Sequence, residues 1–169
     1  MRLGYVIGAQ RGGVDRLLAG VAAQLSAEGW HLAGVVQVNA ERPGRRCDMD
    51  LAVLGGGAVR ISQCLGPLAR GCRLDPSGLE TAVGQVEAAL DAGPPQLLIV
   101  NKFGKAEIGG RGFRPLIARA LGEGVPVLTG VGPGNLDGFL AFADGMAEAL
   151  PDSPAAVLDW CRGAIRAAA

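Results

Sequence analysis

The stretch LGYVIGAQRGGVD, residues Leu3–Asp15, joins a short apolar strand, Leu3–Ile7, to a glycine-rich turn, Gly8–Gly13. Apolar residues then recur at helical spacing over Val14–Glu28. A second apolar run, Leu32–Val38, follows the helix. This order predicts a β–α–β unit, whose two strands lie parallel and are joined by a right-handed crossover.

The rest of the chain continues this alternation, apart from one insertion. Leu51–Leu54 and Ala58–Gln63 flank three glycines, which predicts an inserted β-hairpin. We expect one domain over residues 1–169, a three-layer α/β fold around a mostly parallel sheet, with the last helix packed on its body. The expected helices are Pro76–Leu90, Phe113–Leu121, Asn135–Leu150 and Ala155–Arg166, and the expected strands are Gln96–Val100 and Val125–Thr129.

The overall composition excludes several classes of protein. Sixteen basic residues balance sixteen acidic ones, which argues against a nucleic-acid partner or a strongly charged membrane surface. Apolar runs are far shorter than the roughly 20 residues of a membrane span, and the amino terminus does not resemble a secretory signal, so we expect a cytoplasmic protein. The four cysteines lack CxxC spacing, and His31 is the only histidine, expected half-buried at a strand start, so no metal site or disulfide framework is predicted.

Both lysines of the chain lie within Asn101–Lys105, whereas the other fourteen basic residues are arginine. This segment directly follows the apolar run Leu97–Val100. Lysine offers a compact ammonium group on a flexible stem, so two of them in a glycine-containing loop after a buried strand indicate an anion site. The alternative is a solvated surface loop.

Ligands of parallel α/β sheets bind outside the carboxyl ends of the strands. In this chain those ends carry glycine- or amide-rich segments, including Thr129–Gly134. We therefore predict a ligand-binding edge. Its candidate residues are Gly8, Gln10, Arg11, Gly12, Gly13, Gln37, Asn39, Asn101, Lys102, Gly104 and Lys105.

The first turn has the glycine spacing of a P-loop, GxxxxGK[ST], but Val14 replaces the lysine and Asp15 replaces the hydroxyl residue. Backbone amides of such a turn can still hold an anion; the alternative is a tight turn without a ligand. Asn101 and Lys102 stand where nucleoside triphosphatases carry acidic residues for magnesium. We therefore expect a naked anion rather than a magnesium–nucleotide complex, and expect Asp15 to face an arginine or cap the helix.

Two polar loops place cysteines beside charged residues, Cys47–Asp50 and Arg70–Asp75. Arg70 and Arg73 can bind an oxyanion bidentately, and Cys72 between them is a candidate thiolate ligand. The alternative is an arginine–aspartate network that pins the two loops over the sheet edge. Whether Cys47 or Cys72 binds a metal stays open.

Several segments carry a family resemblance, and they cover most of the chain to about residue 150. They are Val35–Gln37, Cys47–Leu51, Ile61–Gln63, Leu65–Gly66, Arg70–Asp75, Asn101–Lys105 with Glu107, Gly110–Phe113 and Pro126–Thr129. On these segments the sequence resembles an uncharacterised family of small bacterial domains associated with molybdenum and molybdate-transport genes.

The resemblance implies a fold similar to the P-loop nucleoside triphosphatases, in particular a group whose second loop reads Asp-Glu-x-Gly-Lys-x-Glu. Gly104, Lys105 and Glu107 match that pattern, whereas Asn101 and Lys102 depart from it. We expect Glu107 to hold Lys105 in position. The departures put nucleotide hydrolysis in doubt.

The leading hypothesis is a small-ligand-binding domain that takes an oxyanion or a nucleotide-like phosphate, and the resemblance links it to molybdenum. Molybdate, tungstate or a nucleotide is the expected ligand, with magnesium less favoured. One alternative is a magnesium-dependent nucleoside triphosphatase in which Lys102 or Lys105 replaces the absent lysine and Glu107 or Asp15 holds the metal. Another is a regulatory or scaffold protein with a vestigial pocket, docking on a transporter or a cofactor-synthesis enzyme. The sequence leaves enzyme activity, ligand identity and homo-oligomer formation open.

Overall fold

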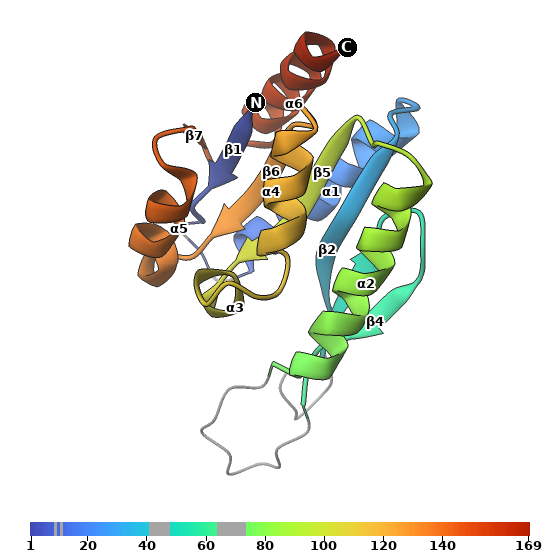
Figure 1. Cartoon of the computed structure of the whole chain (residues 1–169), viewed down its shortest axis with the longest axis vertical. Coiled ribbons are helices and arrows are strands. Elements are labelled where there is room, and N and C mark those ends of the chain that lie inside the picture. Colours follow the sequence, from blue (N-terminus) through green and yellow to red (C-terminus); the bar gives the residue numbers. More distant parts are fainter. Residues whose placement is uncertain (9, 11, 41–47, 64–73) are drawn as a thin grey trace.

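The computed structural model describes residues 1–8, 10, 12–40, 48–63 and 74–169 (Figure 1). Its described part contains one seven-stranded sheet in the order β4-β3-β2-β5-β6-β1-β7. The strands are β1 Leu3–Val6, β2 Leu32–Ala40, β3 Asp48–Val53, β4 Ala58–Arg60, β5 Leu97–Phe103, β6 Val127–Val131 and β7 Ala147–Leu150. The helices are α1 Gly13–Ala27, α2 Pro76–Ala92, α3 Lys105–Ile108, α4 Arg114–Gly122, η1 Pro133–Asn135, α5 Leu136–Ala143 and α6 Pro154–Ala168.

The sheet is parallel except at one edge. β2, β5, β6, β1 and β7 form parallel pairs, whereas β3 runs antiparallel to β2 and β4 antiparallel to β3. The predicted α/β fold with a mostly parallel sheet and an inserted hairpin is therefore confirmed.

Helices cover both faces of the sheet, which makes three layers (Figure 1). Successive side chains of a strand point to opposite faces. In β5, Leu97 and Ile99 pack with residues of α1 and α6, whereas Leu98 and Val100 pack with residues of α2 and α4. All four side chains are fully buried, which explains the continuous apolar run before Asn101.

Aromatic side chains pack α5 against β1 and β5, near the sheet edge where a ligand site is predicted. Phe139 lies 4.9 Å from Tyr5 of β1 and 5.2 Å from Phe103 of β5, measured between ring centroids. Phe142 stacks on Phe103 at 5.1 Å. Phe139 and Phe103 are fully buried, so this cluster is a rigid support for the strand ends beside it.

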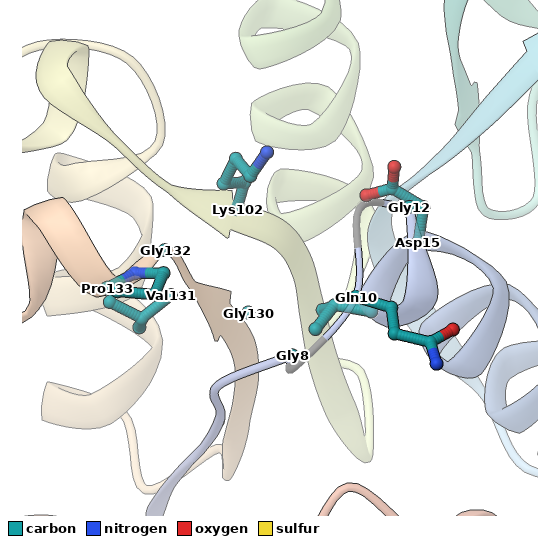
Figure 2. Close-up of a pocket in the computed structure, with 10 residues that line it drawn as sticks. Gly8, Gln10, Gly12, Asp15, Lys102, Gly130, Val131, Gly132 and Pro133 are labelled. Carbon is teal, nitrogen blue, oxygen red and sulfur yellow. The ribbon is translucent and has the colours of Figure 1, made fainter.

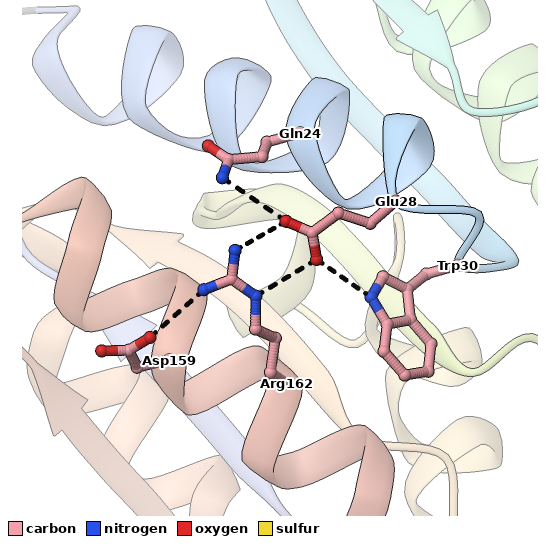
Figure 3. Close-up of polar contacts among 5 residues, drawn as sticks. All are labelled: Gln24, Glu28, Trp30, Asp159 and Arg162. Carbon is pink, nitrogen blue, oxygen red and sulfur yellow. Dashed lines mark hydrogen bonds and ion pairs between the residues drawn. The ribbon is translucent and has the colours of Figure 1, made fainter.

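α6 packs on α1 through both apolar and charged contacts (Figure 3). The Arg162 guanidinium donates to Glu28 at 2.6 and 3.1 Å, and the Trp30 indole donates to the same carboxylate at 3.2 Å. The hydrogen bond from Arg162 is the main cause that lowers the pKa of Glu28 to about 2. Beneath them Cys161 is fully buried, and burial raises the pKa of its thiol to about 12.

Three local predictions need correction. The helix expected over Asn135–Leu150 stops at Asp144, which has a φ of 45°, and the next residues form β7 beside β1. A short helix, α3, follows β5 where only a loop was expected. His31 is exposed rather than half-buried.

Helix α2 begins as the sequence predicts. The Asp75 carboxylate accepts a hydrogen bond from the Ser77 amide at 3.0 Å, and Pro76 takes the first helical position.

In the part of the chain that the structure describes, no helix combines the length and apolar character needed to cross a membrane.

Candidate functional site

The glycine turn links β1 to α1 at the carboxyl edge of the sheet. Gly12 adopts a left-handed conformation, with a φ of 71°, and α1 begins at the next residue. The Gly13 amide donates to the Gln10 carbonyl at 3.1 Å, which closes the turn. The predicted strand–turn–helix is therefore present, with its helix starting at the sheet edge.

A cavity of about 330 Å³ opens beside this turn (Figure 2). One wall is the turn and the start of α1, another is Lys102 of β5, and the third is the segment that leaves β6 for η1. Its described lining residues are Gly8, Gln10, Gly12, Val14, Asp15, Lys102, Gly130, Val131, Gly132 and Pro133. The cavity thus lies where three of the predicted edge segments meet, namely Gly8–Gly13, Asn101–Lys105 and Thr129–Gly134.

Asp15 is buried against this cavity, with 7 % of its surface exposed. Its carboxylate accepts hydrogen bonds from the side-chain amides of Asn101, at 2.8 Å, and Asn39, at 3.0 Å. The expectation that Asp15 faces an arginine or caps the helix is wrong for its described contacts, because the ends of β2 and β5 bring the two asparagines within reach.

The asparagine oxygens are engaged as well. The Asn101 side-chain oxygen accepts from the Gln37 backbone amide at 2.8 Å, and the Asn39 oxygen accepts from the Gln37 side chain at 2.8 Å. The side-chain oxygens of Asp15, Asn39 and Asn101 therefore each already accept a hydrogen bond from within the group. Magnesium binds oxygen ligands, and here those oxygens face N–H groups, so this donor set does not fit a magnesium ion.

Val14, which stands at the position of the P-loop lysine, lies between two glycines. A Cβ atom placed on Gly8 would come within 2.5 Å of one Val14 methyl, and a Cβ on Gly130 within 2.5 Å of the other. The two glycines thus leave room for the valine side chain, which forms an apolar part of the cavity wall.

The two lysines differ in position. Lys102 lines the cavity, whereas Lys105 begins α3 and is absent from the lining. Both are exposed, and within the described residues neither forms an ion pair or a side-chain hydrogen bond. By contrast, four arginines elsewhere hold carboxylates: Arg2, Arg60, Arg119 and Arg162.

Glu107 holds the loop after β5 closed. Its buried carboxylate accepts from the backbone amides of Gly104, at 2.9 Å, and Phe113, at 3.0 Å. The Arg114 guanidinium donates to the Glu107 carbonyl and lies over the Phe142 ring at 4.9 Å. The expectation that Glu107 holds Lys105 is therefore wrong, because backbone amides on both sides of the loop take both carboxylate oxygens.

The structure brings together much of the predicted site. Gly8, Gln10, Gly12 and Lys102 line the cavity, and Gln37, Asn39 and Asn101 form the hydrogen-bonded group behind it. Gly13 starts α1, while Gly104 and Lys105 lie in the adjacent loop. Arg11, Cys47, Arg70, Cys72 and Arg73 lie outside the described residues.

Val14 and Asp15 line the cavity, although neither was predicted from the sequence as a binding residue. The same holds for Gly130, Val131, Gly132 and Pro133, which lie in the predicted edge segment Thr129–Gly134. Their signal is the glycine- and proline-rich stretch directly after a buried strand.

Two aspartates of the polar loops, Asp50 and Asp75, have short-range partners. Asp50 pairs with Arg60 across the hairpin, and Asp75 caps α2. Within the described residues there is no group of three His, Cys, Asp or Glu side chains that could hold a metal ion.

Comparison with known proteins agrees with the fold. The family model described as "Protein of unknown function (DUF2478)" matches residues 3–160, and the chain belongs to this family. The molybdenum import ATP-binding protein ModC 2 of Bradyrhizobium diazoefficiens is 34% identical over 152 residues. That match covers 88% of this chain but only 17% of the length of the relative.

Two solved structures share the architecture. The solution structure of a human cancer-related nucleoside triphosphatase superposes with a TM-score of 0.65 at 18% identity, covering 99% of this chain and 97% of the other. The crystal structure of THEP1 from the hyperthermophile Aquifex aeolicus gives 0.61 at 13% identity, covering 92% and 91%. At these identities the likeness shows the fold alone, which is that of P-loop nucleoside triphosphatases, as the resemblance implied.

Proposed function

We propose that this member of the DUF2478 family acts as a single ligand-binding domain, taking a small anion in the cavity beside Lys102 without a metal ion. The observation that carries the proposal is that Lys102 is among the residues lining the cavity and that its ammonium group has no carboxylate partner among the described residues. An unpaired cation at the mouth of a concave site attracts anions and can bind one directly. The ligand class is an oxyanion or a phosphate group.

The start of α1 supplies the second attraction for an anion. Gly12 and Val14 both line the cavity, so the amino end of a fifteen-residue helix faces it. The partial positive charge at such an end favours a negative group. Gln10 is also a lining residue, but Figure 2 shows its exposed side-chain amide extending away from Gly130, so the attraction is assigned to the helix end alone.

A magnesium-dependent nucleoside triphosphatase is the second candidate, and the fold is what favours it. It would need oxygen ligands for the metal. The Asp15 carboxylate is held by two asparagines, and the Glu107 carboxylate by two backbone amides. Both groups would have to exchange these hydrogen bonds for the metal, so we place this function second.

The link to molybdenum rests on the relative from Bradyrhizobium diazoefficiens, a molybdenum import ATP-binding protein, and on the sequence resemblance. We infer that molybdate and tungstate are the first oxyanions to test, and that a protein of molybdenum transport or cofactor synthesis is the first partner to test. A scaffold role with an idle pocket predicts a partner but no small ligand. Arg11, Arg70, Cys72 and Arg73 stay candidate ligand contacts.

The test is calorimetric titration and thermal denaturation of the purified chain with molybdate, tungstate, phosphate, sulfate, ATP and GTP, each with and without magnesium. A ligand at about 100 times its dissociation constant adds roughly 2.7 kcal/mol, which shifts a domain of this size by several degrees. We expect a magnesium-independent shift with at least one oxyanion.

Lys102→Ala and Lys105→Ala form a matched pair, because each removes the same charge from the same segment and only Lys102 lines the cavity. We expect Lys102→Ala to weaken the anion about tenfold or more, a loss of about 1.4 kcal/mol, and Lys105→Ala to weaken it less. Unchanged affinity in Lys102→Ala would overturn the proposal. A shift that appears only with magnesium and one nucleotide would establish the second candidate instead.

A further inference from the structure

Val14 is wedged between the turn and the neighbouring strand. One of its methyl groups occupies the space beside Gly8, and the other occupies the space beside Gly130. A side chain of any size on either glycine would collide with the valine. The Gly130 position is constrained twice, because a Cβ there would also lie 2.7 Å from the Asn101 carbonyl oxygen.

Gly8 isolates the contribution of the valine. The nearest atom to a Cβ on Gly8 is the Val14 methyl at 2.5 Å, and the next is the Val14 amide nitrogen at 3.5 Å. The side chain at position 14 is therefore what fills this side of the turn. Position 8 has no side chain, and the Val14 side chain occupies the space that one would need.

The wedge is also rigid. A valine in a helix strongly prefers one side-chain rotamer, so its two methyl groups cannot swing away together. Leu18, one turn further along α1, is fully buried and would lie 3.6 Å from a Cβ on Gly130. The valine is thus backed by packed core and does not retreat when a ligand arrives.

An apolar wedge changes which anions the turn can hold. In a P-loop the residue at this position is a lysine that reaches the terminal phosphates of a bound nucleotide. The Val14 side chain offers no hydrogen-bond donor, and phosphate oxygens pressed against its methyl groups would lose water without gaining a partner. Among the described lining residues Lys102 is the one cation, which suits a single anionic group better than a chain of phosphates.

We propose that Val14, held between Gly8 and Gly130, limits the ligand to a compact anion, such as one tetrahedral oxyanion or a terminal monophosphate, and excludes a polyphosphate chain. This inference rests on the proposed function and names the size class of its ligand. Val14 is then the residue that determines specificity, while Lys102 supplies the attraction.

The experiment compares molybdate and inorganic phosphate with inorganic pyrophosphate, by calorimetric titration without magnesium. We expect the unaltered chain to bind at least one compact anion about tenfold or more tightly than pyrophosphate. Val14→Ala opens the space, and Val14→Lys adds an ammonium group. Each should raise the affinity for pyrophosphate relative to the compact anion by about tenfold.

Val21→Ala is the matched control, because Val21 is a buried valine of the same helix that does not line the cavity. It should leave the preference unchanged. Val14→Ala keeps the test open if Val14→Lys does not fold. Thermal denaturation of each variant checks folding.

Equal binding of pyrophosphate and the compact anions by the unaltered chain would overturn this inference and leave the proposed anion site standing. So would a Val14→Ala protein that weakens or strengthens both ligands alike. Failure of every anion to bind the unaltered chain and the Val14 variants would overturn the proposed function, and this inference with it.

Discussion

Helix α1 carries a carboxylate at each end, and the two carboxylates have different kinds of hydrogen-bond partner. At the end beside the proposed ligand cavity (the ligand end), Asp15 is buried and accepts hydrogen bonds from the neutral amides of Asn39 and Asn101. At the α6 end, Glu28 is partly exposed and accepts two hydrogen bonds from the Arg162 guanidinium (Figure 3). The Asp15 carboxylate is thus paired with neutral amide groups, and the Glu28 carboxylate with a guanidinium cation.

The difference shows how a fold keeps a charge available. At the α6 end Arg162 and Glu28 neutralise each other, and their ion pair holds α6 against α1. At the ligand end the asparagines satisfy Asp15, and no carboxylate of the described residues pairs with the Lys102 ammonium group. A lysine paired to a buried aspartate would offer little to an incoming anion.

Breaking the ligand end should have the largest effect on stability. Asp15→Ala leaves the buried Asn101 amide without its acceptor, which costs roughly 1–3 kcal/mol, whereas the exposed Asn39 amide bonds to water instead, so we expect the free energy of unfolding to fall by roughly 1–3 kcal/mol. Urea denaturation measures it. Asp159→Ala on α6 is the control, because that side chain is 79% exposed and should change stability by no more than about 0.5 kcal/mol. Equal effects of the two substitutions would contradict the contrast.

Loosening the loop beside the ligand end should cost less. Glu107→Gln keeps the size of the side chain but offers one acceptor for two backbone amides, so we expect a loss of roughly 1–2 kcal/mol. Hydrogen exchange of the Gly104 and Phe113 amides should quicken at the same time. The exposed Glu123→Gln is the control, and protection of both amides unchanged in Glu107→Gln would show that the carboxylate does not hold the loop.

The α6 end should respond to pH. The pKa of Glu28 is lowered from 4.5 to about 2 in the folded chain. Its contribution is therefore complete above about pH 4.5 and is lost as the pH falls towards 2. We expect the difference in unfolding free energy between the unaltered chain and Glu28→Gln to stay constant near neutrality and to shrink over that acidic interval. A difference of the same size at both extremes would contradict the ion pair.

The smallest effect at neutral pH should come from Cys161 beneath α6. Burial raises the pKa of its thiol to about 12, so the reactive thiolate is scarce in the folded chain. We expect iodoacetamide to spare Cys161 in the native protein and to modify it after unfolding, as mass spectrometry of its peptide would show. Because the folded-state pKa is the higher one, the thiol lowers stability only as the solution becomes alkaline. Rapid modification of the native protein would mean that α6 opens readily.

Local signals in the sequence predict most of the fold, and long-range pairing explains the rest. The glycine turn and the Asp75 cap are decided by residues within a few positions of each other. The segment Ala147–Leu150 has helix-forming residues, yet it becomes β7 because the edge of β1 takes its backbone hydrogen bonds. No pattern near residue 147 indicates that pairing.

The same division applies to the site. The carboxyl edge and Lys102 could be predicted from strand order and composition. The partners of Asp15 could not, because Asn39 and Asn101 come from strands that only the folded sheet brings together. Glu107 is different: an acidic residue three positions after Gly104 that reaches back to its amide is half of a capping box, a signal in the sequence that was available.

The place of β1 in the sheet has a consequence for synthesis of the chain. β1 precedes the other strands of the sheet along the chain, but its two neighbours are β6, Val127–Val131, and β7, Ala147–Leu150. During synthesis the strand that starts the glycine turn therefore stays unpaired on both sides until β6 and β7 have been translated. The cavity beside the turn is completed only then, and a chain that stopped before β6 would expose an apolar strand.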